Sequence, residues 1–280
     1  MNQSLKYKVI RSYCIIFYVL MIYKFWNGLF LFQLQPSFFY LREDIFTWVF
    51  MQTGMHQWLL NNAYGCILFD ILFYSAPLIY LVQFRFDPNR SAIAAILMLV
   101  INWCYVQCYT LYPSNSIEGH IAWLLFPVIF IPSNPKTFAL LFDGLRYFFL
   151  FFFISAGLWK FYQGGIFNPS QMSGILLYQH KEMLVNSPAY WQTIMIQWLI
   201  EHQKISYLLY LLLTVIELSF IIGFFTNKFD KILLVLFLIF LLTGHLVMRI
   251  TYYEVTPLLL TLYYSFRPGL YKIEEGRKEH

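Results

Sequence analysis

Apolar stretches long enough to cross a lipid bilayer recur from one end of this chain to the other. A bilayer-crossing helix needs about 20 predominantly apolar residues. Of the 280 residues, 60% are hydrophobic and only 12% are charged, which is about half the charged share of an average soluble domain. Backbone polar groups must find partners within the protein when water is absent, and helices provide them. We therefore predict an all-α polytopic transmembrane bundle, built as a single domain over residues 1–280.

Turn signals and charged residues divide the apolar stretches into about eight predicted spans. These spans are Val9–Phe32, Gln57–Gln83, Ser91–Leu111, a short one at Glu118–Ile131, Thr137–Tyr162, Ile205–Phe225, Ile232–Thr251 and Glu254–Phe266. Between them, we expect residues 33–55 and 163–204 to be extracytoplasmic segments. We also expect residues 267–280 to be a charged cytoplasmic tail.

The distribution of basic residues predicts the orientation of the chain. Eight spans place both termini on one side, and that side carries most of the lysines and arginines, among them Lys6, Lys8 and Arg11. The positive-inside rule makes this side cytoplasmic, so we expect a bacterial inner-membrane protein. Because the net charge of +5 comes mainly from loop edges and termini, it indicates contact with membrane lipid and not with nucleic acid.

The first candidate for a functional side chain is Lys160, near the end of the predicted span Thr137–Tyr162. A lysine inside or beside a bilayer is costly, so such a residue is a functional candidate. An apolar pocket disfavours the charged form, and a neutral amine can accept a proton from a bound acid such as a hydroquinone. The alternative is that Lys160 snorkels to the headgroups beside Trp159 and Tyr162.

Two histidines and an arginine are predicted at the same extracytoplasmic depth as Lys160. His120 opens the fourth span, while His245 lies in the outer half of the seventh span, with Arg249 one turn further out. Histidine exchanges protons near neutral pH, and arginine can hold an oxyanion or a carboxylate. The alternatives are a helix–helix hydrogen bond for His245, an interfacial position for His120 and a headgroup anchor for Arg249.

Glu217 lies near the middle of the sixth predicted span. An acidic residue at that depth is either a protonated, hydrogen-bonded group or part of a buried polar network. We take Glu217, Arg249 and Trp159 as supporting or substrate-binding candidates, and Lys160, His120 and His245 as catalytic candidates. The aromatic content of 21% suits a lipid or quinone-like ligand, although aromatic belts at the membrane surface use the same residues.

A resemblance to a known family rests on three short segments. The run Ser155-Ala156-Gly157-Leu158-Trp159-Lys160, followed by Gly164-Gly165, resembles the Ala-Gly-x-x-Lys segment of the vitamin K-dependent γ-carboxylases and of the related bacterial HTTM membrane domains. The segment Asn115–Leu125, which contains His120, is similar to the family's histidine segment, and Thr243-Gly244-His245 is similar to its Phe-His helix. DoxX-type membrane proteins are more distant neighbours.

This resemblance implies specific roles for the three candidates. In the family, the lysine matching Lys160 deprotonates vitamin K hydroquinone, the histidine matching His120 assists at the substrate carbanion, and the histidine matching His245 lies near the active site. The implied cofactor is a quinol, either vitamin K hydroquinone or menaquinol, and no metal is expected. This chain departs from the family pattern at Trp159, where a second lysine can stand, and it has no large lumenal portion for binding a peptide substrate.

The sequence therefore leaves two main hypotheses for function. One is an enzyme, carboxylase-like or a quinone-linked oxidoreductase, that acts on a quinol or on a periplasmic peptide or protein through Lys160 at the outer membrane face. The other is a non-catalytic membrane factor for maturation, assembly or export of a secreted peptide or protein. A lipid or ion transporter ranks below both, because the two halves of the chain do not repeat.

Overall fold

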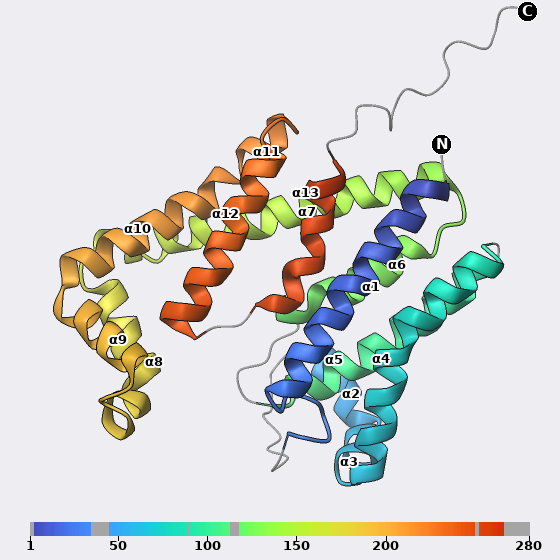
Figure 1. Cartoon of the computed structure of the whole chain (residues 1–280), viewed down its shortest axis with the longest axis horizontal. Helices are drawn as coiled ribbons and strands as arrows, with labels where there is room; N and C mark the ends of the chain where they lie inside the picture. The colour runs from blue at the N-terminus through green and yellow to red at the C-terminus, as the bar shows by residue number, and fades with distance from the viewer. Residues whose placement is uncertain (1–2, 35–44, 89, 113–117, 250–251, 266–280) are drawn as a thin grey trace, which may run out of the picture. The chain divides into compact units, whose positions relative to one another are not determined.

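The computed structural model describes residues 3–34, 45–88, 90–112, 118–249 and 252–265. Every regular element among these residues is a helix (Figure 1). The described residues form two compact units. The first contains the residues up to 143 together with 253–260, and the second contains residues 144–252 and 261–265. The expectation of one domain over the whole chain stays a prediction.

Within the described residues, six helical stretches are long and apolar enough to cross a membrane. They are Leu5–Trp26, Ala63–Phe86, Ser91–Thr110, Pro135–Tyr162, Gln203–Phe225 and Asp230–Met248. The all-helical fold predicted for an integral membrane protein is thereby confirmed. The number of eight spans and the cytoplasmic location of both termini stay predictions.

Two of the eight predicted spans are short in the structure. The fourth corresponds to α6 (Ile121–Phe130), whose 10 residues extend only about 15 Å, half of a hydrocarbon core of about 30 Å. The eighth is divided between a 3₁₀ helix, η4 (Tyr253–Leu258), and α13 (Leu259–Tyr264). Each contains a proline, Pro127 in α6 and Pro257 in η4. Because proline has no backbone N–H to donate, it interrupts the hydrogen bonding of a helix.

The first unit is built from consecutive helices of the N-terminal half. These are α1 (Gln3–Trp26), α2 (Ile45–Gln52), α3 (Met55–Leu60), α4 (Ala63–Phe86), α5 (Ser91–Thr110), the 3₁₀ turn η1 (Glu118–His120) and α6, joined by the start of α7 (Pro135–Tyr162) and by η4. Its core is aromatic: the rings of Phe73 and Tyr105 stack with centroids 3.8 Å apart, and Trp123 packs beside Phe73. Such packing suits an apolar interior, because flat rings fill space and interact favourably.

The second unit contains the rest of α7 and the elements that follow it. These are η2 (Gly165–Phe167), α8 (Gln171–Asn186), α9 (Trp191–Glu201), α10 (Gln203–Ser219), α11 (Ile222–Phe225), α12 (Asp230–Thr243) and a π-helical turn, η3 (Gly244–Met248), with the end of α13. In Figure 1, α8 and α9 form a hairpin at the end of α10 where that helix begins. Residues 163–204, predicted as an extracytoplasmic segment, are therefore mostly helical.

A buried ion pair fixes the arrangement of helices in the second unit. Arg146 on α7 donates from Nε to Oδ2 of Asp230 at 2.8 Å and from Nη2 to Oδ1 at 2.6 Å. It also donates to the carbonyl of Gly223 at 2.9 Å, and Ser265 donates to the same aspartate. Because both charged side chains are almost fully buried, removing either one would leave an uncompensated charge, at a cost of about 3–5 kcal/mol.

Candidate functional site

Lys160 and Glu217 form an ion pair in the second unit. The Lys160 ammonium donates to Oε1 of Glu217 at 2.9 Å and lies 2.8 Å from Oε2. The Glu217 side chain is 3% exposed and the Lys160 side chain 23%. The pair thus has a buried acid and a base with an accessible edge, which is a suitable arrangement for exchanging a proton with a bound molecule.

The close approach of α7 and α10 brings these two residues together. At Gly157, a Cβ atom would lie 2.9 Å from Cδ2 of Leu218 and 3.3 Å from Cβ of Glu217. The absence of a side chain at Gly157 therefore allows the two backbones to come close, as small residues do between membrane helices. Lys160 lies almost one turn after Gly157 and reaches Glu217 across the contact.

The ring of Tyr210 also lies near the lysine. The Lys160 ammonium is 5.2 Å from the centroid of this ring, within the range of a cation–π interaction. Tyr210 is buried and belongs to α10, as Glu217 does. The lysine thus contacts one carboxylate and lies near one aromatic ring, both carried by α10.

The partner of Lys160 lies well inside a membrane-length stretch. Glu217 follows Gln203 by 14 residues and precedes Phe225 by 8 in the stretch Gln203–Phe225, distances of about 21 Å and 12 Å along a helix. Lys160 was expected near the outer end of its span, and α7 does end two residues later at Tyr162. Glu217 lies near the end of α10, at Ser219, but the apolar stretch continues to Phe225, so the contact places the ammonium beside the interior of this stretch.

This geometry permits two arrangements of one proton. In the first, the lysine is an ammonium and the glutamate a carboxylate, which attract each other strongly where water is scarce. In the second, the proton has moved to Glu217 and Lys160 is a neutral amine. Only the second arrangement makes Lys160 a base, so Glu217 is the group that controls whether Lys160 can accept a proton.

The other candidates of the second unit are Trp159, His245 and Arg249. Trp159 is exposed and stacks on Tyr162, with centroids 5.3 Å apart. His245 is half-buried in the π-helical turn η3. Arg249 is exposed, and its Nη1 contacts the sulfur of Met183 at 3.3 Å.

His120 belongs to the first unit, where it lies in a second buried polar cluster. Its Nε2 is 3.7 Å from Oε1 of Glu254, and the ammonium of Lys24 is 2.6 Å from the same oxygen. Lys24 also lies over the ring of Tyr109, 4.3 Å from its centroid. The Glu254 carboxylate thus has one ammonium and one imidazole beside it.

The first unit also contains a buried acidic residue, Asp70, which accepts hydrogen bonds from residues of the same unit. Its carboxylate accepts the hydroxyl of Tyr105 at 2.6 Å and the backbone N–H groups of Leu31 and Phe32 at 3.2 Å and 3.1 Å. A buried carboxylate with three donors is well satisfied. Asp70 therefore holds the chain that follows α1 against α4 and α5.

Sequence reasoning missed the partners in these clusters. Lys24 interrupts the apolar run of the first predicted span, and a charge at that position is itself a signal of a buried partner. Glu254 and Asp230 gave no such signal, because each stands next to a predicted loop, where charged residues are common. Their pairing with residues far away in the sequence depends on how the helices pack.

Comparison with known proteins assigns no family to the chain. No protein-family model, no curated protein and no solved structure matches it. The resemblance to carboxylase-like membrane domains thus rests on the segments quoted above.

Proposed function

We propose that this protein is a carboxylase-like integral membrane protein in which the Lys160–Glu217 pair is an acid–base centre. The single observation that supports this proposal is the contact of Lys160, through both carboxylate oxygens at 2.9 Å and 2.8 Å, with a glutamate that is almost fully buried. A purely anchoring lysine would extend to the headgroups and would need no buried acid. The substrate is a quinol, such as vitamin K hydroquinone or menaquinol, or a periplasmic peptide or protein.

The proton-transfer step uses only groups of this pair. With the proton on Glu217, the neutral Lys160 amine accepts a proton from an acidic hydroxyl or a C–H acid and becomes an ammonium. Glu217 then returns its own proton toward solvent or product, which restores the ion pair. The exposed aromatic side chains next to Lys160 in the sequence, namely Trp159, Phe161 and Tyr162, fit an apolar molecule that carries a ring.

The two histidines have supporting roles in this proposal. His245 belongs to the same unit as Lys160, and His120 lies beside Glu254 in the other unit. A histidine next to a carboxylate is well suited to donating or accepting a proton near neutral pH. Quinol consumption in single His120→Gln and His245→Gln variants measures each role separately from that of Lys160.

The test is turnover of a reduced quinone by the full-length protein in lipid vesicles. With menaquinol, bicarbonate and oxygen present, we expect the wild-type protein to consume quinol, and Lys160→Ala to lower the rate by about 100-fold or more, the usual contribution of a general base. Glu217→Gln should lower the rate as well, because glutamine cannot take the proton from Lys160. Lys136→Ala is the matched control, an exposed lysine of the same helix, and should leave the rate unchanged.

Two outcomes would contradict this proposal. Full turnover in a folded Lys160→Ala variant would remove Lys160 from the chemistry. Absence of quinol consumption by the wild-type protein would favour the second hypothesis, a non-catalytic factor for maturation, assembly or export of a secreted peptide or protein. One observation favours that hypothesis: Lys160 and Glu217 satisfy each other as an ion pair, as a structural pair would. In that case, secretion of the client would persist in Lys160→Ala and His245→Ala.

A further inference from the structure

The helix α9 exposes a row of large apolar side chains along one face. Trp191, Ile194 and Trp198 are 57%, 56% and 45% exposed, and their spacing of three and four residues places them on one side of a helix. On the opposite side, Ile196 and Leu199 are buried. A helix with an exposed apolar face of this kind needs a partner, since contiguous apolar surface in water is unfavourable.

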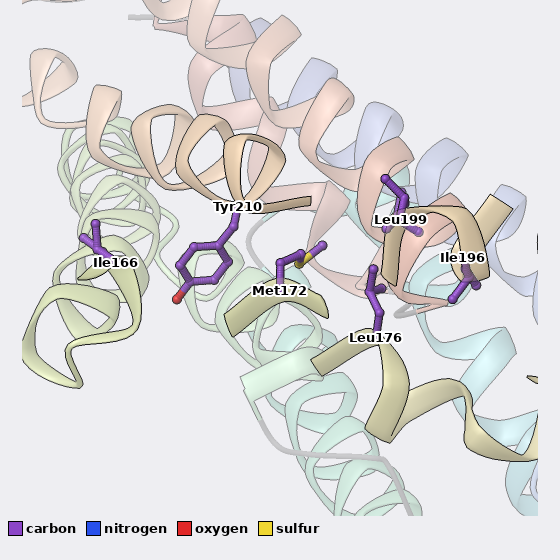
Figure 2. Close-up of a cluster of buried hydrophobic side chains, with 7 residues drawn as sticks. Ile166, Met172, Leu176, Ile196, Leu199 and Tyr210 are labelled. Carbon is purple, nitrogen blue, oxygen red and sulfur yellow. The ribbon is translucent and has the colours of Figure 1, made fainter. Parts of the chain in front are cut away.

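The buried face of α9 holds the α8–α9 hairpin in place. Ile196 and Leu199 pack against Met172 and Leu176 of α8 and against Tyr210 of α10, together with Ile166 and Val247. Figure 2 shows these side chains meeting between the three helices, with Tyr210 pointing toward Ile166 and Met172. The exposed row of α9 is therefore attached to a well-packed core and not to a loose loop.

The hairpin lies beside parts of the chain that are long and apolar enough to be inside the membrane. Tyr207 donates its hydroxyl to the carbonyl of Ile166, and Gln192 donates to the carbonyl of Leu246 at 2.7 Å. Tyr207 lies four residues inside the stretch Gln203–Phe225, and Leu246 lies two residues inside the end of Asp230–Met248. Ile166 belongs to η2, shortly before α8, and Gln192 belongs to α9. The turn η2 and the hairpin therefore lie beside these two stretches, near their ends.

The exposed apolar row of α9 is followed along the chain by a second exposed apolar row, on α10. On α10, the exposed residues Ile205, Leu208, Leu212 and Val215 form another row with helical spacing. This row begins directly after α9, since only His202 separates α9 from α10. A membrane-length helix exposes such a row to acyl chains, so the same lipid is available to α9.

Polar side chains at the edge of the hairpin define how deep it can lie. Gln197 donates to Glu201 at 3.0 Å on the exposed surface of α9, and Lys181 of α8 lies over the ring of Tyr178 at 5.4 Å. These groups require water or headgroups. An apolar row that contains two tryptophans, next to polar side chains, is typical of a helix at the membrane surface.

We propose that the α8–α9 hairpin is a membrane-surface element, with the Trp191–Ile194–Trp198 row of α9 immersed in one leaflet of the bilayer. This inference is independent of the chemistry proposed for Lys160. In this proposal, part of the segment 163–204, which the sequence predicts to be extracytoplasmic, is bound to lipid. Since Tyr210 belongs both to the hairpin core and to the surroundings of Lys160, the hairpin would also bring the membrane surface close to the ion pair.

The test is the environment of a fluorescent label on α9 in the full-length protein. Ile194→Cys is labelled with a polarity-sensitive nitrobenzoxadiazole group, and the protein is reconstituted into phosphatidylcholine vesicles. The label at position 194 should emit at shorter wavelength, and nitroxide lipids should quench it about twofold or more, as expected for a helix buried at the acyl boundary. Glu182→Cys, at an exposed charged position of α8, is the matched control, and iodide in the water should quench it more strongly.

Labelling of the wild-type protein measures the background from its four cysteines, and a second label at Trp191→Cys guards against a local defect at position 194. Equal quenching of positions 194 and 182 by iodide would overturn the proposal, because α9 would then be in water. Protection of position 194 from both iodide and nitroxide lipids would also overturn it. That result would assign the row to a contact with a protein.

Discussion

At the scale of single residues, the charged groups of this protein are stabilised by partners distant in the sequence. Lys160 pairs with Glu217, Arg146 with Asp230 and Lys24 with Glu254. In apolar surroundings a lone charge is costly, and pairing with hydrogen bonds reduces that cost. Lys160 and Glu217, which the sequence singled out as candidates for function, are therefore also determinants of packing.

His180 offers a test at this scale, through the pH dependence of stability. Its Nε2 lies 2.9 Å from the carbonyl of Val247, and because a carbonyl only accepts, Nε2 carries the proton. Burial lowers the pKa of His180, the Val247 carbonyl opposes this effect, and Arg249 adds to it. The neutral form is thus favoured in the folded state.

We therefore predict that stability falls as the pH is lowered through the ordinary histidine pKa of about 6.5. The unfolded chain takes up a proton on His180 at a higher pH than the folded chain does, so acid favours unfolding. His180→Gln retains a donor to Val247 but cannot take up a proton. The melting temperature of this variant should therefore fall less between about pH 7.5 and about pH 5.5. The difference should be about 2–4 °C for each kcal/mol that protonation of His180 contributes to unfolding.

Thermal unfolding of the purified protein in detergent, followed by size-exclusion chromatography, measures this difference. The matched control is His202→Gln, a change at an exposed histidine at the end of α9. If the wild-type protein, His180→Gln and His202→Gln all lose the same melting temperature on acidification, His180 makes no contribution to the pH dependence of stability.

At the scale of elements, the contact between α7 and α10 decides whether the candidate site exists. Gly157 and Gly223 are the glycines at which a Cβ would meet a neighbouring leucine of the facing element, Leu218 at 2.9 Å and Leu150 at 2.6 Å respectively. Helices can approach closely at such positions. The ion pair of Lys160 and Glu217 depends on this approach, because lysine and glutamate must meet within hydrogen-bonding distance.

We predict that Gly157→Val destabilises the protein and separates Lys160 from Glu217. The valine Cβ would lie within 3.3 Å of both Leu218 and Glu217, and overpacking of this kind costs about 1–3 kcal/mol. Gly144→Val, in the same helix, is the matched control, since nothing lies within 4 Å of its added Cβ. Melting temperatures that are the same for the two variants would contradict the predicted role of Gly157.

At the scale of the whole molecule, the chain is an integral membrane protein whose described residues form two compact units. Each unit has its own buried polar cluster, with Lys24, His120 and Glu254 in the first and Lys160 and Glu217 in the second. The catalytic candidates predicted from the sequence are therefore divided between the units. A role for His120 in the chemistry of Lys160 is a separate question from the role of Glu217.

For the whole molecule, we predict the orientation of the chain in the membrane. The basic residues near both termini and at alternate loops predict that both ends are cytoplasmic. We expect green fluorescent protein to fluoresce when fused to either terminus, and alkaline phosphatase to be inactive there. Alkaline phosphatase inserted after Ser187, between α8 and α9, should be active and serves as the control. Termini on opposite sides would show that the number of crossings is odd.

The sequence by itself determined the class of fold and the outline of the helices. Long apolar stretches leave the backbone only one way to satisfy its hydrogen bonds in lipid, so helices in a membrane follow from composition and length alone. Lys160 and Glu217 were both recognised as candidates for the same reason, since a charge in such a stretch is conspicuous.

Only the tertiary structure decided which charged residues meet. Pairs such as Lys160 with Glu217, Lys24 with Glu254 and Arg146 with Asp230 depend on the rotation and axial register of helices that are far apart in the sequence. An apolar stretch fixes neither quantity, because any face and many depths satisfy the bilayer equally well. Close packing at glycines such as Gly157 fixes both, and with them the chemistry of the site.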